Sequence, residues 1–167
     1  MNIDEAKKQF VSAWGSFGSN WGINRTMAQI HALLMVSTKP LNADEVMEAL
    51  SISRGNTNMN IRELINWGLV ERVVISGERK EFFTAEKDIW KVAKTILKER
   101  KKRELEPMTR FLENLQVKEN AEDAEVKAFN DIIKSIKELS EEAEKTIDTI
   151  VKADESWFWN AFLKILK

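Results

Sequence analysis

The chain has 167 residues, of which 43% are hydrophobic and 32% are charged, and its formal net charge is −1. This composition is typical of a soluble, largely helical protein with a sizeable core. The longest apolar run, 32–36, is far shorter than the roughly 20 residues of a membrane span, and the absence of cysteine excludes disulfide bonds and thiolate metal sites. The N-terminus lacks the layout of a secretory signal, so we expect a cytoplasmic protein that does not enter a membrane.

Charge is unevenly distributed along the chain. Residues 1–85 balance at nine basic and nine acidic side chains, residues 86–110 carry nine basic and five acidic, and residues 111–167 carry eight basic and thirteen acidic. A protein with this overall balance can bind nucleic acid only through a local face.

Short helices and one hairpin are predicted in the first half of the chain. Apolar residues recur there at helical spacing, and Asn42 with Glu45 has the spacing of a capping box after the break at Pro40. Ser53 and Gly68 are suited to begin and end a further helix. The predicted helices cover residues 2–17, about 25–37, 43–50 and 53–67, and the hairpin strands cover 69–75 and 80–85.

The second half is predicted to be helical throughout. Its helices cover 86–105, about 107–116 beyond Pro107, 121–153 and an amphipathic segment over 155–167. The basic run at 98–103 is either a solvated helix face or a contact to the DNA backbone. The helix over 121–153 has a coiled-coil seam with steps of three and four, formed by Phe129, Ile132, Ile136, Leu139, Ala143, Thr146, Ile150 and Ala153.

The order helix, helix, helix, hairpin predicts a mainly α fold with a small β-hairpin wing. We expect a winged helix-turn-helix flanked by long dimerisation helices. In this division, residues 1–22 form an N-terminal helix that contributes to dimerisation, residues 23–86 form the DNA-binding domain, and residues 87–167 form a helical dimerisation region.

The helix predicted over 53–67 is filled with residues that weaken helices. Gly55, Thr57 and several asparagines are poor helix formers, whereas a surface helix filled for stability would carry Ala, Glu, Lys and Gln. Asn can bridge the N6 and N7 edge of adenine, Arg can bridge the O6 and N7 edge of guanine, and glycine lets the backbone approach a groove. On a helical wheel, Thr57, Ile61, Leu64 and Ile65 share the side that faces the core. The predicted DNA contacts are Ser53, Arg54, Gly55, Asn56, Thr57, Asn58, Met59 and Arg62.

The tip of the hairpin, "SGERK" at 76–80, is the predicted wing. Arg79 and Lys80 can reach phosphates or lie along the minor groove, whereas phosphates would repel Glu78. Short turns with glycine and charges are common, so the tip indicates a wing only in the context of the preceding helices.

Three stretches carry a family resemblance. They are the Trp14–Arg25 region with its "WG" and "NR" pairs, "KPLNADEVMEALSISRGNTNMNIRELINWGLVERV", and "GERKEFFTAEKDIW". Together they span about half the chain, and they resemble the glycine betaine synthesis repressor-like group of the MarR superfamily. The resemblance implies a transcriptional regulator that dimerises through flanking helices and binds palindromic double-stranded DNA operators. It also implies that the helix with Arg54, Asn56, Asn58 and Arg62 enters the major groove, with the wing near Arg79.

The predicted apolar surface also indicates a homodimer, independently of the family resemblance. The N-terminal stripe of Phe10, Trp14 and Phe17 and the seam at 129–153 offer more apolar surface than one small winged domain can cover. The alternative is that the chain's own helices bury both.

A small-molecule effector is a further open question. Some relatives in the resembled group look like sensors of choline or similar quaternary ammonium compounds, which bind in cages of aromatic faces. Aromatic residues at helical spacing are more often core residues than ligand cages. The cage candidates are Trp14, Phe17, Trp21 and Trp90, with Trp157 and Trp159 near the end of the chain.

The sequence gives little support for an enzyme. The single histidine, His31, lies between apolar residues in a predicted helix, and we found no metal-ligand spacing and no phosphate-binding glycine loop. We therefore expect no catalytic activity, no cofactor and no metal.

The leading interpretation is a DNA-binding repressor that acts as a homodimer. The alternative is a winged-helix protein-interaction or assembly module without sequence-specific DNA binding, which the balanced charge of the winged region favours.

Overall fold

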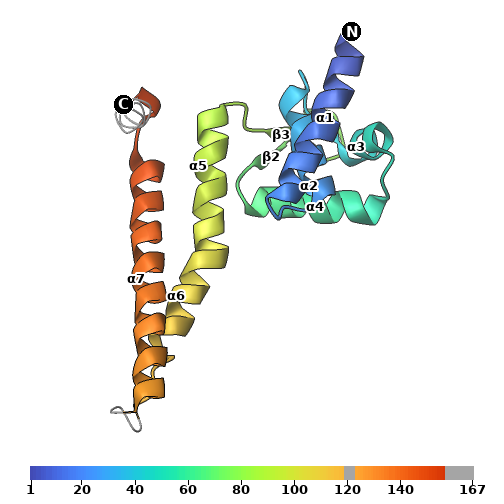
Figure 1. Cartoon of the computed structure of the whole chain (residues 1–167). Coiled ribbons are helices and arrows are strands. Elements are labelled where there is room, and N and C mark those ends of the chain that lie inside the picture. The colour runs from blue at the N-terminus through green and yellow to red at the C-terminus, as the bar shows by residue number, and fades with distance from the viewer. Residues whose placement is uncertain (119–122, 157–167) are drawn as a thin grey trace. The chain divides into compact units, whose positions relative to one another are not determined.

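The structure is a computed structural model that describes residues 1–118 and 123–156. The chain divides into two compact units, Met1–Val92 and the residues from Ala93 onward, and each unit is described by itself. Figure 1 shows the elements of both units in chain order. Most of the amphipathic segment predicted at 155–167, including Trp157 and Trp159, lies outside the described residues.

Four short helices build most of the first unit, and each begins at a polar N-cap. Asn2 and Asn42 form capping boxes with Glu5 and Glu45, and Asn24 and Ser53 accept hydrogen bonds from backbone N–H groups of the first turn. These caps satisfy N–H groups that a helix start leaves without partners. The helices are α1 (Ile3–Asn20), α2 (Arg25–Val36), α3 (Ala43–Leu50) and α4 (Arg54–Asn66).

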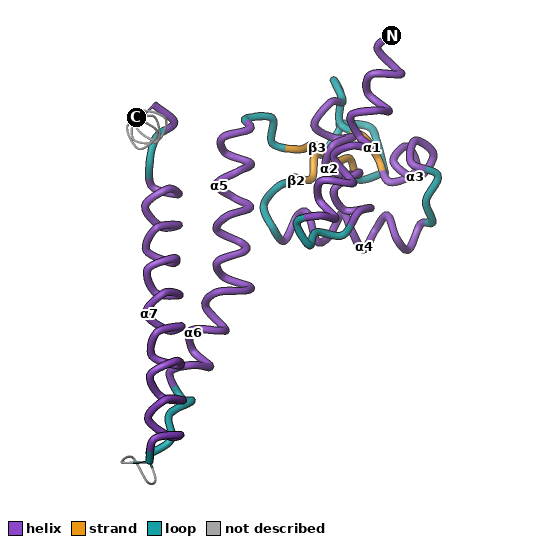
Figure 2. Tube along the Cα trace, viewed as in Figure 1, coloured by secondary structure: helices purple, strands orange, loops and turns teal. Residues whose placement is uncertain are grey.

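A three-stranded antiparallel sheet completes the first unit (Figure 2). It consists of β1 (Leu41–Asn42), β2 (Val70–Val73) and β3 (Phe82–Ala85), with β3 in the middle. The predicted hairpin is confirmed, with Val70 opposite Ala85 and Val73 opposite Phe82, although both strands are shorter than predicted. The pairing of Leu41 with Phe83 was not predicted, because two residues after a proline give no periodic signal.

Helix α1 runs further than the sequence predicts. We expected the first helix to end at residue 17, yet α1 continues to Asn20, and the chain turns at Gly22 with a φ of 75°. Val11 and Gly15 are the buried residues of α1, whereas Phe10 and Phe17 of the predicted stripe are 36% and 62% exposed. Among the described residues, Phe10 and Phe17 of the N-terminal stripe are therefore not buried.

The second unit contains the end of α5 (Ile89–Arg100), a π-helical turn at Lys101–Leu105, α6 (Glu106–Glu113) and α7 (Ala124–Lys152). The predicted break at Pro107 is wrong, because the helical path continues from Lys101 into α6. Proline has no N–H group, and its ring would clash with the carbonyl four residues earlier in a regular α-helix. The wider π turn, closed by a hydrogen bond from the Glu106 N–H to the Lys101 carbonyl, precedes the proline and accommodates it.

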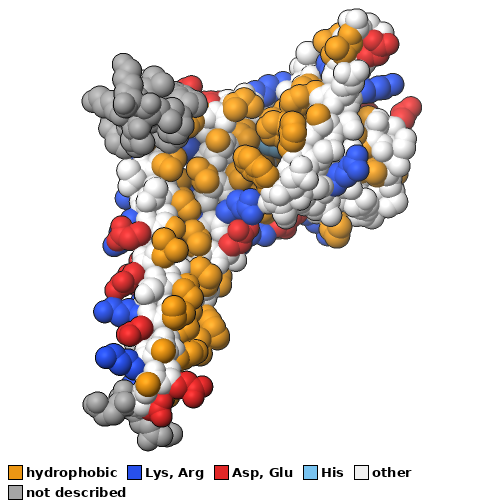
Figure 3. Space-filling model, in the orientation of Figure 1, with side chains coloured by type: hydrophobic (Ala, Val, Ile, Leu, Met, Phe, Trp, Pro, Cys, Tyr) orange, Lys and Arg blue, Asp and Glu red, His pale blue; other side chains and the backbone are white. Residues whose placement is uncertain are grey.

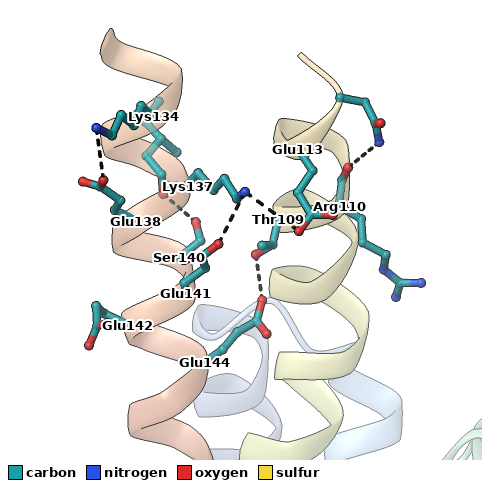
Figure 4. A network of polar contacts seen from close by, with 12 residues as sticks. Thr109, Arg110, Glu113, Lys134, Lys137, Glu138, Ser140, Glu141, Glu142 and Glu144 are labelled. Carbon is teal, nitrogen blue, oxygen red and sulfur yellow. Dashed lines mark hydrogen bonds and ion pairs between the residues drawn. The ribbon is translucent and has the colours of Figure 1, made fainter. Parts of the chain in front are cut away.

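Polar side chains form several contacts between helices α6 and α7. The Thr109 hydroxyl donates to the Glu144 carboxylate at 2.7 Å, and Lys137 forms ion pairs with Glu113 and Glu141 (Figure 4). Asn130 holds the end of the connecting segment by two hydrogen bonds with the Val117 backbone. Half of the side chains that α7 turns inward are polar. The inward positions are Val126, Asn130, Ile133, Lys137, Ser140, Glu144, Ile147 and Val151.

The predicted coiled-coil seam of α7 lies one residue away from this inward row. Phe129, Ile132, Ile136 and Leu139 are 40%, 61%, 40% and 73% exposed. On α6, Met108 and Phe111 are also exposed, and Figure 3 shows apolar side chains gathered along this part of the unit. The alternative that the chain's own helices bury this half of the seam is therefore wrong for the described residues.

Candidate nucleic-acid interface

Helix α4 is held in place from its inner side. Thr57, Ile61 and Leu64 are buried in the first unit, and they recur at the spacing of one helix face. Ser53 caps the start, and Gly68, with a φ of 75°, follows the last turn in the left-handed conformation that favours glycine. The predicted helix bounds and inner face are confirmed, so an unfavourable local sequence folds here because of its tertiary packing.

The outer side of α4 presents an open surface. A Cβ atom placed on Gly55 would meet no heavy atom within 4 Å. Asn58 and Arg62 are exposed, and Met59 is 60% exposed. The first two turns therefore bring together a bare backbone, an amide, a thioether and a guanidinium, which are groups suited to base edges and thymine methyls.

Thr57 does not belong to this surface. Its side chain is fully buried, and its hydroxyl donates to the Ser53 carbonyl at 3.0 Å. The prediction of a DNA contact by Thr57 is wrong, because the residue faces the core one position away from the exposed asparagine.

Asn56 is positioned by a partner that we did not predict. The buried Asn60 amide donates to the Asn56 carbonyl at 2.8 Å and to the Asn56 side-chain Oδ1 at 2.7 Å. Both N–H groups of Asn60 are thereby satisfied, and the Asn56 amide N–H groups point away from this bond. The i to i+4 spacing of the two asparagines was the signal that could have indicated the pair.

The wing is a tight turn between β2 and β3. The Glu78 N–H donates to the Ile75 carbonyl, and Gly77 has a φ of 86°. Arg79 is exposed at the tip, whereas Lys80 forms an ion pair with Asp44 of α3 at 2.8 Å. The same Asp44 carboxylate binds Arg54 at 2.6 Å.

A shallow cleft separates α4 from the hairpin. It has a volume of about 120 Å³, and an ion pair of 3.2 Å between Arg72 and Glu81 forms part of its wall. Neither residue was predicted for the site. The alternation of β2 gives a signal for Arg72 only, because side chains two apart on a strand share a face and Glu81 lies outside this strand. The cleft is lined by Asn58, Ile61, Arg62, Ile65, Arg72, Glu81 and Phe83.

The charges around α4 and the wing balance. Five basic side chains, Arg54, Arg62, Arg72, Arg79 and Lys80, stand beside five acidic ones, Asp44, Glu63, Glu71, Glu78 and Glu81. Over residues 1–92 the count is eleven basic and eleven acidic. Binding of phosphates at this face would therefore depend on individual basic side chains and not on a net positive charge.

Comparison with known proteins agrees with this geometry. Residues 21–80, from the end of α1 to the wing, match the model of the MarR family. This segment is therefore similar to a MarR-family domain. Around this domain the chain is similar to two Bacillus subtilis proteins, the HTH-type transcriptional regulator YvaV and the HTH-type transcriptional repressor OpcR. The identities are 22% over 56% of this chain and 53% of YvaV, and 23% over 53% of this chain and 48% of OpcR.

One further relative and one solved structure are similar to this chain. The Mycobacterium tuberculosis transcriptional regulator MmpR5 is 28% identical over 45% of this chain and 46% of its own length. The crystal structure of a transcriptional regulator superposes with a TM-score of 0.58 at 17% identity and covers 86% of this chain and 99% of its own. The winged helix-turn-helix fold is thus confirmed, whereas the matched segments span only about half the length of the three relatives.

The aromatic candidates do not form an enclosed cage in the described residues. Trp14 packs on Phe10 with ring centroids 5.5 Å apart. Phe17 and Trp21 are 62% and 68% exposed, and Trp90 is half-buried. These contacts fit helix packing and exposed apolar surface.

His31 of α2 is a core residue. It is 2% exposed, and burial lowers the pKa of its imidazole from 6.5 to about 4. The described part of the chain contains no group of three or more His, Asp or Glu side chains that could hold a metal ion. Among the same residues, no helix combines the length and apolarity needed to cross a bilayer.

Proposed function

We propose that the protein is a sequence-specific DNA-binding transcriptional regulator. Helix α4 enters the major groove with Arg54, Asn56, Asn58 and Arg62, and the wing at Arg79 and Lys80 contacts the backbone or the minor groove. The observation that supports this most strongly is the open surface at Gly55. A glycine there weakens the helix and packs against nothing, so its use is to let an external partner approach.

The protein acts as a homodimer on a palindromic operator. The support is the arrangement of α7, which turns Asn130, Lys137 and Ser140 inward and leaves Ile132 and Leu139 exposed. Apolar side chains at heptad spacing gain free energy only when a partner covers them, and a second copy offers the same seam. The exposed stripe of α1 at Phe10 and Phe17 contributes to the same assembly.

The regulator is a cytoplasmic repressor of the glycine betaine synthesis repressor-like group. The motif between Ser53 and Val70 supports the subgroup, and the name of OpcR as a repressor supports the direction of control. In this subgroup a quaternary ammonium compound is the effector to test, with Trp14 and Trp90 as the residues to probe first.

A second candidate is a winged-helix module for protein contacts and assembly. The balanced charge of residues 1–92 favours it, because DNA-binding domains often carry a positive excess. The outer face of α4 argues against it, since Asn58 and Arg62 with a bare glycine are not the apolar anchors of a protein interface.

Electrophoretic binding to duplexes selected from a random pool tests the regulator. The wild type should give a specific complex whose affinity falls steeply with salt. Asn56→Ala and Arg62→Ala should each weaken the specific complex by roughly 5- to 150-fold, which corresponds to about 1–3 kcal/mol per bidentate base contact. Lys8→Ala is the matched control, because it removes an exposed charge from α1. A wild type that binds all duplexes alike, or not at all, contradicts the proposal.

A further inference from the structure

One carboxylate joins three parts of the proposed DNA-binding face. Asp44 Oδ1 accepts from the Arg54 guanidinium at 2.6 Å, and Asp44 Oδ2 accepts from Lys80 Nζ at 2.8 Å. Asp44 lies in the first turn of α3, Arg54 begins α4, and Lys80 lies in the wing. The carboxylate therefore connects the predicted recognition helix to the predicted wing through residues 36 positions apart in the chain.

These ion pairs contribute little to folding. All three side chains are exposed, from 42% for Asp44 to 65% for Arg54. Exposed pairs of this kind are screened by solvent and add little to the free energy of unfolding. Hydrogen bonds from Lys80 and then Arg54 hold the pKa of the Asp44 carboxyl below its usual value, so Asp44 stays charged in neutral solution. Asp44 instead affects where the Arg54 and Lys80 side chains lie and how much of their positive charge is available to a duplex.

The first consequence concerns non-specific binding. Affinity for any duplex comes mainly from cations that neutralise phosphates and release counterions. Asp44 forms ion pairs with two of the five basic side chains of this face. Residues 1–92 carry no net positive charge that could replace them. A duplex without the right sequence must displace these pairs to use Arg54 and Lys80.

The second consequence concerns specific binding. An arginine presents five N–H donors, and Asp44 is bound to one terminal nitrogen of Arg54, so other donors remain available. A side chain that is already restrained loses less conformational entropy when it binds. The carboxylate thus favours one placement of the guanidinium at the start of α4.

We infer that Asp44 is a positioning residue that sets the ratio of specific to non-specific DNA binding, because it holds Arg54 and Lys80 on one carboxylate. This inference rests on the proposed function, since it requires a duplex that the protein prefers. It makes an acidic residue on the DNA-binding face a contributor to specificity.

The test compares Asp44→Asn with Glu48→Gln, which removes the same charge from an exposed position of the same helix. Each full-length variant is titrated with the selected duplex and with a scrambled duplex of equal length over a salt series. For Asp44→Asn we expect tighter binding to the scrambled duplex, a salt slope steeper by about one to two, and a specificity ratio lower by about tenfold. Glu48→Gln should leave the ratio within about twofold of the wild type, because Coulomb interactions weaken with distance in water. Asp44→Glu should restore most of the ratio, because it returns the charge.

Each outcome has one meaning. Thermal unfolding of each variant measures whether it folds. If Asp44→Asn is unstable, Asp44→Ser replaces it, and the inference then predicts a lower specificity ratio for Asp44→Ser than for Asp44→Glu. A wild type that discriminates, together with an unchanged ratio in folded Asp44→Asn, overturns the inference and leaves the regulator standing. Equal weakening on both duplexes also overturns it. A wild type that does not discriminate contradicts the regulator and this inference together.

Discussion

Gly18 of α1 lies directly against Ala28 of α2. A Cβ atom on Gly18 would be 2.6 Å from the Ala28 Cβ, a distance that real side chains do not adopt. One turn earlier, a Cβ atom on Gly15 would be 2.5 Å from the Gln29 side chain. Two glycines on one face thus allow α1 and α2 to approach closely, and the largest set of helix contacts in the first unit depends on them.

Gly18→Val should therefore destabilise the first unit. Inserting a branched side chain into this contact forces the helices apart, at a cost of about 1–3 kcal/mol. The free energy of unfolding, measured by urea denaturation, should fall by that amount. Ser16→Val is the control, because Ser16 is an exposed residue of the same helix. An unchanged urea midpoint in Gly18→Val would show that α1 does not pack closely on α2.

Gly55→Ala should weaken DNA binding without destabilising the fold. The added methyl group meets nothing within 4 Å, and alanine is the better helix former, so the free energy of unfolding should stay constant or rise by up to about 1 kcal/mol. Affinity for the selected duplex should fall, because the methyl group stands where the backbone approaches the groove. Unfolding curves and titrations of one preparation check both parts. Full affinity in this variant would mean that no duplex approaches Gly55.

Leu139→Lys should convert the dimer to a monomer without unfolding the chain. Leu139 is 73% exposed in the isolated chain, so lysine costs the monomer little, whereas a charge in an apolar seam is costly when a partner covers it. Light scattering at micromolar concentration should give twice the chain mass for the wild type and the chain mass for the variant. Glu138→Lys, at the neighbouring exposed position, is the control and should remain dimeric. A wild-type monomer would remove the basis for the proposed assembly.

His31 should make folding sensitive to mild acid. Its pKa is 6.5 in the unfolded chain and about 4 in the folded protein, so the unfolded state binds the proton more readily. The contribution of neutral His31 is complete above pH 6.5 and is lost as the pH falls toward 4, with a total of roughly 3 kcal/mol. Urea denaturation between pH 7 and pH 4 checks this, and His31→Gln should flatten the dependence over that range. The same pH slope in the variant would assign the effect to carboxylates instead.

The sequence predicted the parts of the fold that local chemistry determines. The capping box at Asn42, the cap at Ser53 and the glycine at 68 fix helix ends through nearby atoms, and periodicity fixed the inner face of α4. Helix α1 extends beyond residue 17, where we expected it to end, and Gly18 in this extension packs on α2. The helical path continues through Pro107 after a π turn. Both outcomes depend on contacts or hydrogen bonds that a residue-by-residue pattern does not contain.

The candidate site was likewise predicted only where the local sequence determines it. Exposure of Gly55, Asn58 and Arg62 follows from the helix period. The Asp44 carboxylate between Arg54 and Lys80 brings together residues from three elements, and only the packed fold specifies that arrangement. The error at Thr57 arose from treating the whole start of α4 as one exposed surface.

The most direct test of the account is selection of duplex DNA from a random pool by the wild type and by Arg62→Ala, read by sequencing. If α4 reads bases in the major groove of a palindromic operator, the wild type should enrich a motif with two-fold symmetry. Arg62→Ala should lose preference at one base pair in each half and keep the remainder, because one bidentate contact is removed. Enrichment of no motif by the wild type, or of an unchanged motif by the variant, would contradict the claim that α4 reads DNA sequence.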